Sequence, residues 1–257
     1  MVSKQNLVTR VFNTALALSS SLLLMLLWLL SLEYYLTLKL SNCPYIVIAF
    51  AILLRTFLHT GLFVITHDAI HGSAAPQNRQ INNWLGTLAI GLYAFLPYEK
   101  LRNQHFLHHR YPTSSRDPDY HEGYKSNFFT WYLCFMQAYL KGKQVLIILA
   151  GVSVVSFMAL KLLGVQPINL LLFWLIPLVL SSIQLFYFGT YLPHRYAATR
   201  DRTKHCATST QLSMFWSLIT CYHFGYHLEH HSYPSLPWHA LPGCRRTLFK
   251  QHLEVAR

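Results

Sequence analysis

Acidic side chains are scarce in this chain. Only 9 of its 257 residues are Asp or Glu, and charged residues of both signs make up 12% of the sequence. This composition is far from that of an ordinary soluble domain. The sequence also lacks a glycine-rich phosphate loop, a G-x-S-x-G motif and an H-E-x-x-H motif. The last absence argues against an intramembrane zinc protease.

The cysteines carry no recognisable metal or disulfide pattern. There are five of them, with no C-x-x-C pair and no zinc-finger spacing. We therefore interpret them as reduced thiols without a metal role. They are Cys43, Cys134, Cys206, Cys221 and Cys244.

Long apolar runs take the place of the missing charge. Residues 11–31 contain no charged side chain, and at about 1.5 Å per residue they span roughly 30 Å, the thickness of a bilayer core. No small-residue cleavage site follows this run, so it does not resemble a signal peptide. Further candidate spans are 44–66, 144–163 and 167–191. The pattern predicts an all-α integral membrane protein of about four transmembrane helices, forming a single domain over residues 1–257.

Other apolar segments are too short or too polar to be ordinary spans. Residues 81–97 suit a re-entrant or interfacial segment, and the aromatic-rich stretch 128–140 and residues 211–224 suit interfacial helices. Arg55 and His59 interrupt the second span four residues apart, so they share a helix face that we expect to turn inward. For His59 an interior hydrogen bond is the favoured role, with a place behind a metal ligand as the alternative.

The net charge of +12 invites a nucleic-acid partner, but its distribution argues against one. Lys39 and Lys161 are the only basic residues in the two short connections between spans. The positive-inside rule then places both termini and the long middle segment in the cytoplasm. Topology alone explains the basic surface, although such a surface also attracts anionic lipid or an acidic protein.

Eight of the fifteen histidines form three tight clusters. On a helix, residues three and four apart share a face, so each cluster aims two or three imidazoles at one point. A lone histidine is more often a core or surface residue, but this many gathered imidazoles would need hydrogen-bond partners or a metal. Imidazole suits transition metals, and three convergent sets are about right for two ions. The clusters are His67-Asp-Ala-Ile-His71, His105-Phe-Leu-His108-His109 and His227-Leu-Glu-His230-His231.

All three clusters fall on the predicted cytoplasmic side, immediately after or between spans. The chain on the other side is too short to build a site. We therefore expect a cytoplasmic cap holding a histidine-rich di-metal site on a four-helix membrane stem.

The order H-x-x-x-H, H-x-x-H-H, H-x-x-H-H around four spans resembles the membrane fatty acid desaturase and hydroxylase superfamily of non-haem di-iron enzymes. Within it, three stretches look like the β-carotene ketolases (carotenoid 4,4′-oxygenases) of the bacterial and cyanobacterial type. These are residues 188–195, residues 103–105 with 116–121, and residues 223–234.

The resemblance implies two iron ions and nine ligands. Eight are the clustered histidines His67, His71, His105, His108, His109, His227, His230 and His231. The ninth is expected at the end of the fourth span, where desaturases place N-x-x-x-H. Here that stretch is Thr190-Tyr-Leu-Pro-His194, so His194 is the candidate and Thr190 replaces the asparagine. His223 is an alternative ninth donor, although we favour a pocket or ring-orienting role for it.

Acidic residues near the clusters are candidates for orienting ligand rings through the second imidazole nitrogen. Asp68 and Glu229 lie within two clusters, and Asp117 and Asp119 closely follow the middle one. For these last two, a solvated turn is the alternative. His121 is a further candidate for the pocket or for orienting a ligand.

The resemblance also implies a reaction. Such ketolases use O2 to oxidise the C4 and C4′ methylenes of β-ionone rings to ketones, converting β-carotene to echinenone and canthaxanthin. The aromatic-rich stretches 92–97 and 186–188 are candidate walls for a polyene tunnel. No flavin, nicotinamide or cytochrome b5-like motif is present, so we expect electrons from a ferredoxin-type donor on the basic face.

Two kinds of alternative remain. One keeps the fold and changes the reaction, to a carotenoid β-ring hydroxylase or a fatty-acyl desaturase. The other is a membrane metal transporter, which would place donors near the mid-bilayer on broken helices.

Overall fold

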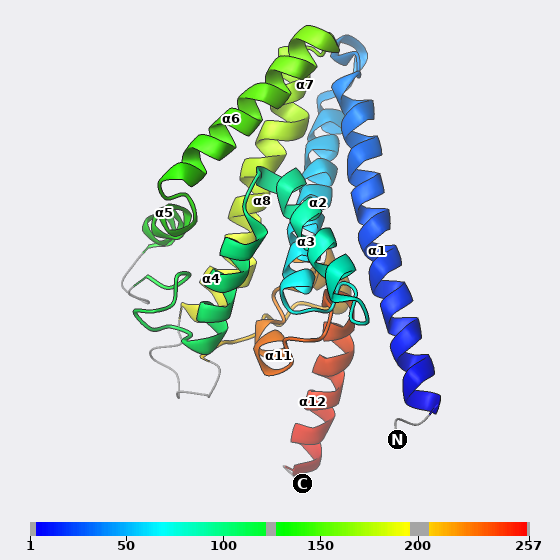
Figure 1. The fold of residues 1–257 in the computed structure, drawn as a ribbon, viewed down its shortest axis with the longest axis vertical. Helices are drawn as coiled ribbons and strands as arrows, with labels where there is room; N and C mark the ends of the chain where they lie inside the picture. Colours follow the sequence, from blue (N-terminus) through cyan, green and yellow to red (C-terminus); the bar gives the residue numbers. More distant parts are fainter. Residues whose placement is uncertain (1–3, 122–126, 196–205, 256–257) are drawn as a thin grey trace.

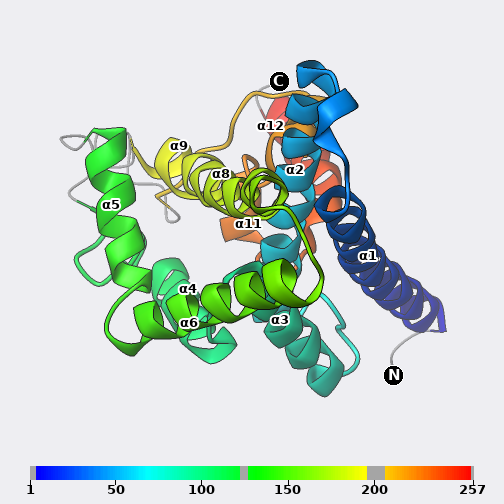
Figure 2. The same ribbon diagram turned by 90° about the horizontal axis from the view of Figure 1, so that it is seen from above.

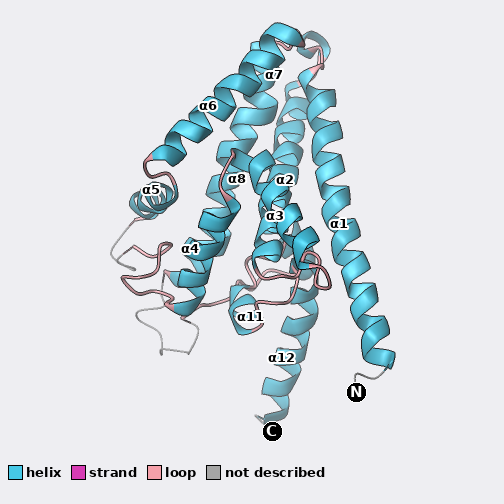
Figure 3. Ribbon diagram, viewed as in Figure 1, coloured by secondary structure: helices cyan, strands magenta, loops and turns pink. Residues whose placement is uncertain are grey.

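Four helices dominate the molecule, and each is long and apolar enough to cross a bilayer. The computed structural model describes residues 4–121, 127–195 and 206–255, and every regular element within these ranges is helical (Figure 3). The predicted all-α membrane class is confirmed. The spans are Thr14–Leu36, Tyr45–Ile70, Lys143–Leu162 and Pro167–His194.

Helix α2 (Tyr45–Ile70) is the central element. It packs against α1 (Lys4–Leu36), to which η1 (Leu40–Asn42) connects it, and against the fourth span. Leu62 and Val64 in its second half are completely buried. A helix that is apolar on all sides is best accommodated in the middle of a bundle, and this position carries the end of α2 into the core of the cap.

Helix α3 (Arg79–Ala94) is the closest neighbour of α2, along its second half (Figure 1). Glycine permits this approach: a Cβ atom on Gly86 would lie 2.7 Å from the Cβ of Ala69. The Asn78 side chain caps the helix by accepting a hydrogen bond from the Ile81 amide at 3.0 Å. With 16 residues, α3 is not among the helices long enough to span a membrane.

The fourth span is one continuous helix with two π-helical segments inside it. Such π-bulges occur frequently at functional sites. The second of them precedes the last turn, which carries His194. In chain order the segments are α7 (Pro167–Leu170), η4 (Leu171–Leu175), α8 (Ile176–Phe186), η5 (Tyr187–Tyr191) and α9 (Leu192–His194).

The polar face of α2 turns inward, as its sequence predicts. Arg55 is fully buried and donates to the Trp28 carbonyl at 2.7 Å and, through Nε, to the Phe173 carbonyl in the π-helical segment η4 at 3.0 Å. His59 accepts from the Trp28 indole and faces the Tyr93 carbonyl, both at 3.0 Å. The favoured prediction of an interior hydrogen bond for His59 is confirmed.

Helix α6 (Lys143–Phe157), extended by the π-helical η3 (Met158–Leu162), leans away from the bundle (Figure 2). Of the 18-residue stretch that is most apolar in this span, only 6% is buried within the protein. Because its exposed surface is aliphatic, this helix offers the bilayer an extended apolar face.

Helices α4, α11 and α12 extend toward the end of the bundle opposite its short connections, where α1 begins, and α5 lies near mid-height (Figure 1). This end carries the histidines, so the predicted cap at one end of the stem is present. The helices outside the four spans and α3 are α4 (Tyr98–Arg110), α5 (Phe128–Tyr139), α10 (Met214–Cys221), α11 (His227–Ser232), η6 (Trp238–Ala240) and α12 (Leu241–Val255).

Candidate metal centre

The nine histidines expected as ligands converge into two groups. Within each group the potential ligand nitrogens lie within 4.8 Å of one another. Four segments supply them: the end of α2, helix α4, the last turn of the fourth span, and α11. The five-histidine group consists of His67, His71, His105, His109 and His230, and the four-histidine group of His108, His194, His227 and His231.

In the five-histidine group, several ring nitrogens lie close to one another. The Nε2 atom of His105 lies 2.8 Å from that of His71 and 3.0 Å from that of His109. His230 Nε2 lies 2.9 Å from His109 Nε2, and the His67 ring centre is 4.5 Å from the ring centre of His230. These rings meet edge to face around a common point.

The four-histidine group has the same spacing. His227 Nε2 lies 3.0 Å from the Nε2 atoms of both His194 and His231. His108 Nε2 lies 3.1 Å from His231 Nε2. Ligands about 2.1 Å from a metal and at right angles to each other would lie about 3.0 Å apart. The observed spacing therefore fits nitrogens arranged around a metal ion.

Hydrogen bonding on the far side of two rings tests this fit. His108 Nδ1 lies 3.0 Å from both oxygens of Asp117, so this nitrogen carries the proton and donates. His194 Nδ1 likewise donates to the Cys206 carbonyl at 2.8 Å. In the neutral rings, both Nε2 atoms then present lone pairs toward the same group. Two lone pairs directed into one buried group of imidazoles fit a metal ion, and the donor set suits a transition metal.

The electrostatics of the site favour the metal-binding form of imidazole. Burial lowers the pKa values of His105, His227 and His230 well below the usual range, and neighbouring imidazoles add to the effect. For His108 burial acts in the same direction and is the largest single effect, but the hydrogen bond to Asp117 together with the charges of Asp119 and Asp117 outweighs it, and the pKa is raised. Metals bind imidazole in its deprotonated, neutral form.

Of the four acidic residues predicted to orient rings, Asp117 makes that contact. Asp119 lies farther away, 3.8 Å from His108 Nδ1, and burial raises its pKa to about 6. Asp68 accepts from the Trp238 backbone amide, and one of its oxygens is 3.9 Å from His67 Nδ1.

The structure gives the Glu229 carboxylate partners other than a histidine ring. This carboxylate accepts from the Ser209 hydroxyl and from Arg245 at 2.8 Å, and makes no hydrogen bond to a histidine of either group. The side chain points away from the rings because it projects from a different face of α11 than His227, His230 and His231.

His223 belongs to neither group. Its ring stacks on Tyr226 at an angle of 10° and on Trp238 at 24°, and burial lowers its pKa to about 4. The structure therefore favours His194 over His223 as the ninth histidine of the cluster. His121 lies outside both groups and does not line the cavity described next.

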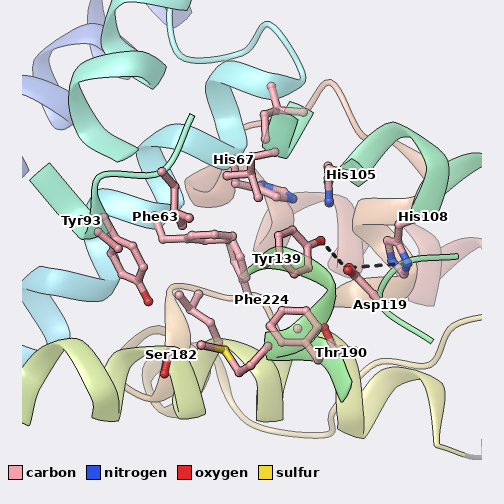
Figure 4. A pocket seen from close by; sticks show the side chains of 18 of the residues that line it. Phe63, His67, Tyr93, His105, His108, Asp119, Tyr139, Ser182, Thr190 and Phe224 are labelled. Atoms are coloured by element: carbon pink, nitrogen blue, oxygen red, sulfur yellow. Dashed lines mark hydrogen bonds and ion pairs between the residues drawn. The ribbon is translucent and has the colours of Figure 1, made fainter. Parts of the chain in front are cut away.

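A cavity of about 300 Å³ leads away from the histidines (Figure 4). Rings of both groups form one end of it, and most of its remaining wall is apolar. Thr190, in the asparagine position of the desaturase pattern, lines it as well. Of the two predicted walls, residues 92–97 contribute Tyr93, Ala94 and Leu96, whereas Phe186 packs against α5 instead.

One face of α5 forms a wall that the sequence analysis missed. Tyr132, Phe135, Met136 and Tyr139 all line the cavity. Their spacing of three, four and seven residues marks a single helix face, and that periodicity was the available signal. Lys100 donates to the Tyr139 carbonyl at 3.3 Å and so fastens this wall to α4.

Comparison with known proteins identifies relatives of the chain. The fatty acid desaturase family matches it over residues 43–154 and 136–254. A β-carotene ketolase of Paracoccus sp. (strain PC1) is 40% identical over 75% of this chain and 76% of its own length. A zeaxanthin 4-ketolase of Chlamydomonas reinhardtii is 38% identical over 91% of this chain and 52% of its own length.

The algal relatives are longer proteins. A β-carotene 4-ketolase 3 of Haematococcus lacustris is 40% identical over 77% of this chain and 62% of its own length. The chain therefore spans 52% to 62% of these two relatives.

Proposed function

Because the chain belongs to the fatty acid desaturase family, we propose that it is a β-carotene ketolase that converts the C4 methylenes of β-ionone rings to ketones. The single observation that carries this proposal is the apolar cavity that ends on five of the nine converging histidines. The names and identity of the relatives support it. A hydrocarbon substrate needs an apolar pocket, and oxidation of a ring methylene by O2 calls for a redox-active centre such as a transition metal.

The two histidine groups would each hold one iron ion, five nitrogens for one and four for the other. When bound, the iron pair supplies the chemistry that inserts one atom of O2 into a C–H bond while the other is reduced to water. The protein's own part is to keep the imidazoles neutral and oriented. Burial favours the neutral form, and Asp117 and the Cys206 carbonyl orient the rings of His108 and His194 through their Nδ1 atoms.

The cavity would position the ring and exclude water. Phe63 and Phe224 lie beside His67 at the histidine end, and Tyr93 and Ser182 lie toward the other end (Figure 4). Aromatic walls offer a polyene extensive contact area without competing hydrogen bonds. A cavity of about 300 Å³ would accept one end of a long hydrocarbon, with the remainder extending toward the bilayer.

Electrons would come from a small acidic ferredoxin on the cytoplasmic side, where we place both termini and the metal site. Exposed basic side chains occur at the histidine-bearing end of the protein, among them Arg79, Arg110, Arg116, Lys141 and Arg246. An acidic donor docking there would meet complementary charge close to the metal centre. The same residues suit the positive-inside rule.

Expression in cells that accumulate β-carotene tests the proposal directly. New ketocarotenoid in a pigment extract is the expected outcome. Hydroxylated rings without ketone would show a β-ring hydroxylase instead. Unchanged β-carotene together with altered lipid unsaturation would contradict the proposal in favour of a fatty-acyl desaturase.

A further inference from the structure

The carboxylate of Asp119 lies in the cavity wall beside the metal centre and is only partly satisfied. The residue is 8% exposed, and it lines the cavity. Oδ1 accepts a hydrogen bond from the Tyr139 hydroxyl at 2.5 Å. Its backbone is fixed as well: the amide donates to Asp117 at 2.9 Å, and the carbonyl accepts from Trp131 at 2.8 Å.

The other oxygen, Oδ2, is left without a hydrogen bond from the residues that the structure describes. The nearest imidazole nitrogen to Oδ2 is His108 Nδ1, at 3.8 Å. That distance is beyond hydrogen-bond range, and the Nδ1 proton is already directed at Asp117. A carboxylate oxygen that borders a largely apolar cavity is stabilised when a donor reaches it. A hydroxyl group on a molecule that enters the cavity would supply such a donor.

The second carboxylate in the cavity wall differs in this respect. Both oxygens of Asp68 accept from the Trp238 amide, at 3.2 and 3.3 Å. Figure 4 shows Asp119 between Tyr139, which reaches across the cavity, and His108 of the metal centre. A hydroxyl group on a carbon that is held near the histidines would thus lie within reach of Asp119.

We infer that Asp119, held in place by Tyr139, binds the hydroxyl group of the alcohol formed in the first oxidation and so retains that ring for the second oxidation. This inference rests on the proposed function. The hydrocarbon substrate has no donor to offer Asp119, but the alcohol has one. The intermediate is therefore held more tightly than the molecule from which it is made.

The two oxidations balance as follows. In the first, the methylene, O2, two electrons and two protons give the secondary alcohol and one water. In the second, the alcohol, O2, two electrons and two protons give the geminal diol and one water, and the diol loses another water to leave the ketone. The external ferredoxin supplies the electrons in both. Holding the alcohol oxygen at Asp119 keeps the remaining C–H bond of the same carbon toward the histidines.

Tyr139→Phe and Asp119→Asn test this role in the full-length, iron-loaded protein. We expect the ratio of alcohol to ketone in the product to rise at least severalfold in both. In protein kept without reductant, the affinity for the C4 alcohol relative to β-carotene should fall about tenfold in Asp119→Asn, as for loss of a charged hydrogen bond. A merely structural role would lower both oxidations together and leave the ratio unchanged.

Tyr132→Phe is the matched control. This tyrosine lines the same cavity, and its hydroxyl contacts Ser182 Oγ at 2.6 Å rather than Asp119. Its alcohol-to-ketone ratio should equal that of the wild type. If Asp119→Asn loses iron, Tyr139→Phe decides the question, because Tyr139 contacts no histidine of either group through a hydrogen bond.

The possible failures are distinguishable. A wild-type protein that forms no oxidised carotenoid would overturn the proposed function itself. Ketone from the wild type, with an unchanged ratio and unchanged relative affinity in iron-loaded variants, would overturn this inference alone.

Discussion

The Nδ1 atom of His108 lies 3.0 Å from both carboxylate oxygens of Asp117. The carboxylate is itself fixed, because it accepts hydrogen bonds from the backbone amides of Thr113 and Asp119 at 2.9 Å. His108 is thereby locked in the tautomer that turns its Nε2 lone pair toward His231. A short acidic loop after α4 thus determines how one ring of the four-histidine group is presented.

Removing the charge of Asp117 should weaken metal binding. In Asp117→Asn the amide keeps the shape of the side chain, but one of its two ends can no longer accept from His108. Loss of such a partner typically costs 10–100-fold in metal affinity. Competition with a chelator of known affinity measures it. Glu99→Gln, which removes an exposed carboxylate paired with Arg102, should retain wild-type affinity.

His194 and His223 should behave differently when replaced by alanine. His194→Ala removes one nitrogen of the four-histidine group, so the iron content should fall well below the expected two ions per chain. His223→Ala should retain the full iron content, because its ring stacks on Tyr226 outside both groups. Elemental analysis of the purified proteins checks both. Equal iron loss in the two variants would contradict the assignment of His194.

Arg55 should stabilise the bundle by joining three helices. Its guanidinium donates to the Trp28 carbonyl and the Ser31 hydroxyl of α1 and to the Phe173 carbonyl of the fourth span. The ammonium of Arg55→Lys lacks the fork that reaches all three. Leaving one or more acceptors unsatisfied should cost about 1–3 kcal/mol.

Thermal unfolding of the detergent-solubilised protein measures the effect of Arg55→Lys. Arg102→Lys provides the control, since Arg102 pairs with Glu99 near the surface. Unchanged stability of Arg55→Lys would show that the three contacts contribute nothing beyond packing.

Turnover with ferredoxin should decrease as salt increases. Exposed basic residues at the histidine-bearing end would attract an acidic donor, and at 0.5 M salt the screening length falls to roughly 4 Å. The measurement is the ketone formation rate with purified ferredoxin at low and high ionic strength. A small uncharged reductant should support a rate that salt leaves unchanged. The same insensitivity with ferredoxin would argue against electrostatic docking.

Periodicity and spacing predicted the larger part of the fold. Four charge-poor runs became the four spans within a few residues, and the i, i+4 position of Arg55 and His59 gave the buried face of α2. Histidine spacing likewise gave eight of the nine residues that converge, whereas His194 came from the family resemblance. The structure divides the second and third clusters between the two groups, so the rings of one cluster do not all meet at one point. Apolar runs and histidine spacing are local features, so sequence alone carries them.

Contacts that depend on loop geometry could not be predicted in this way. His223 precedes His227 by four residues, which would place both on one face of a helix. The chain instead turns there, with Tyr222 and His223 both at positive φ, 47° and 64°, and His223 leaves the site. Glu229 pairs with Arg245 on α12, and Tyr139 donates a hydrogen bond to Asp119. Both contacts depend on tertiary packing, which the spacing of residues along the sequence does not predict.

Helices α4 and α11 each contribute histidines to both groups. Helix α4 gives His105 and His109 to one and His108 to the other, and α11 gives His230 to one and His227 with His231 to the other. If each group binds one metal ion, we expect the two binding events to be thermodynamically coupled, because an ion in either group would help to order both helices and so lower the entropic cost of binding the second ion. Titration of the apoprotein should accordingly pass from empty to fully loaded chains with little half-loaded species between them.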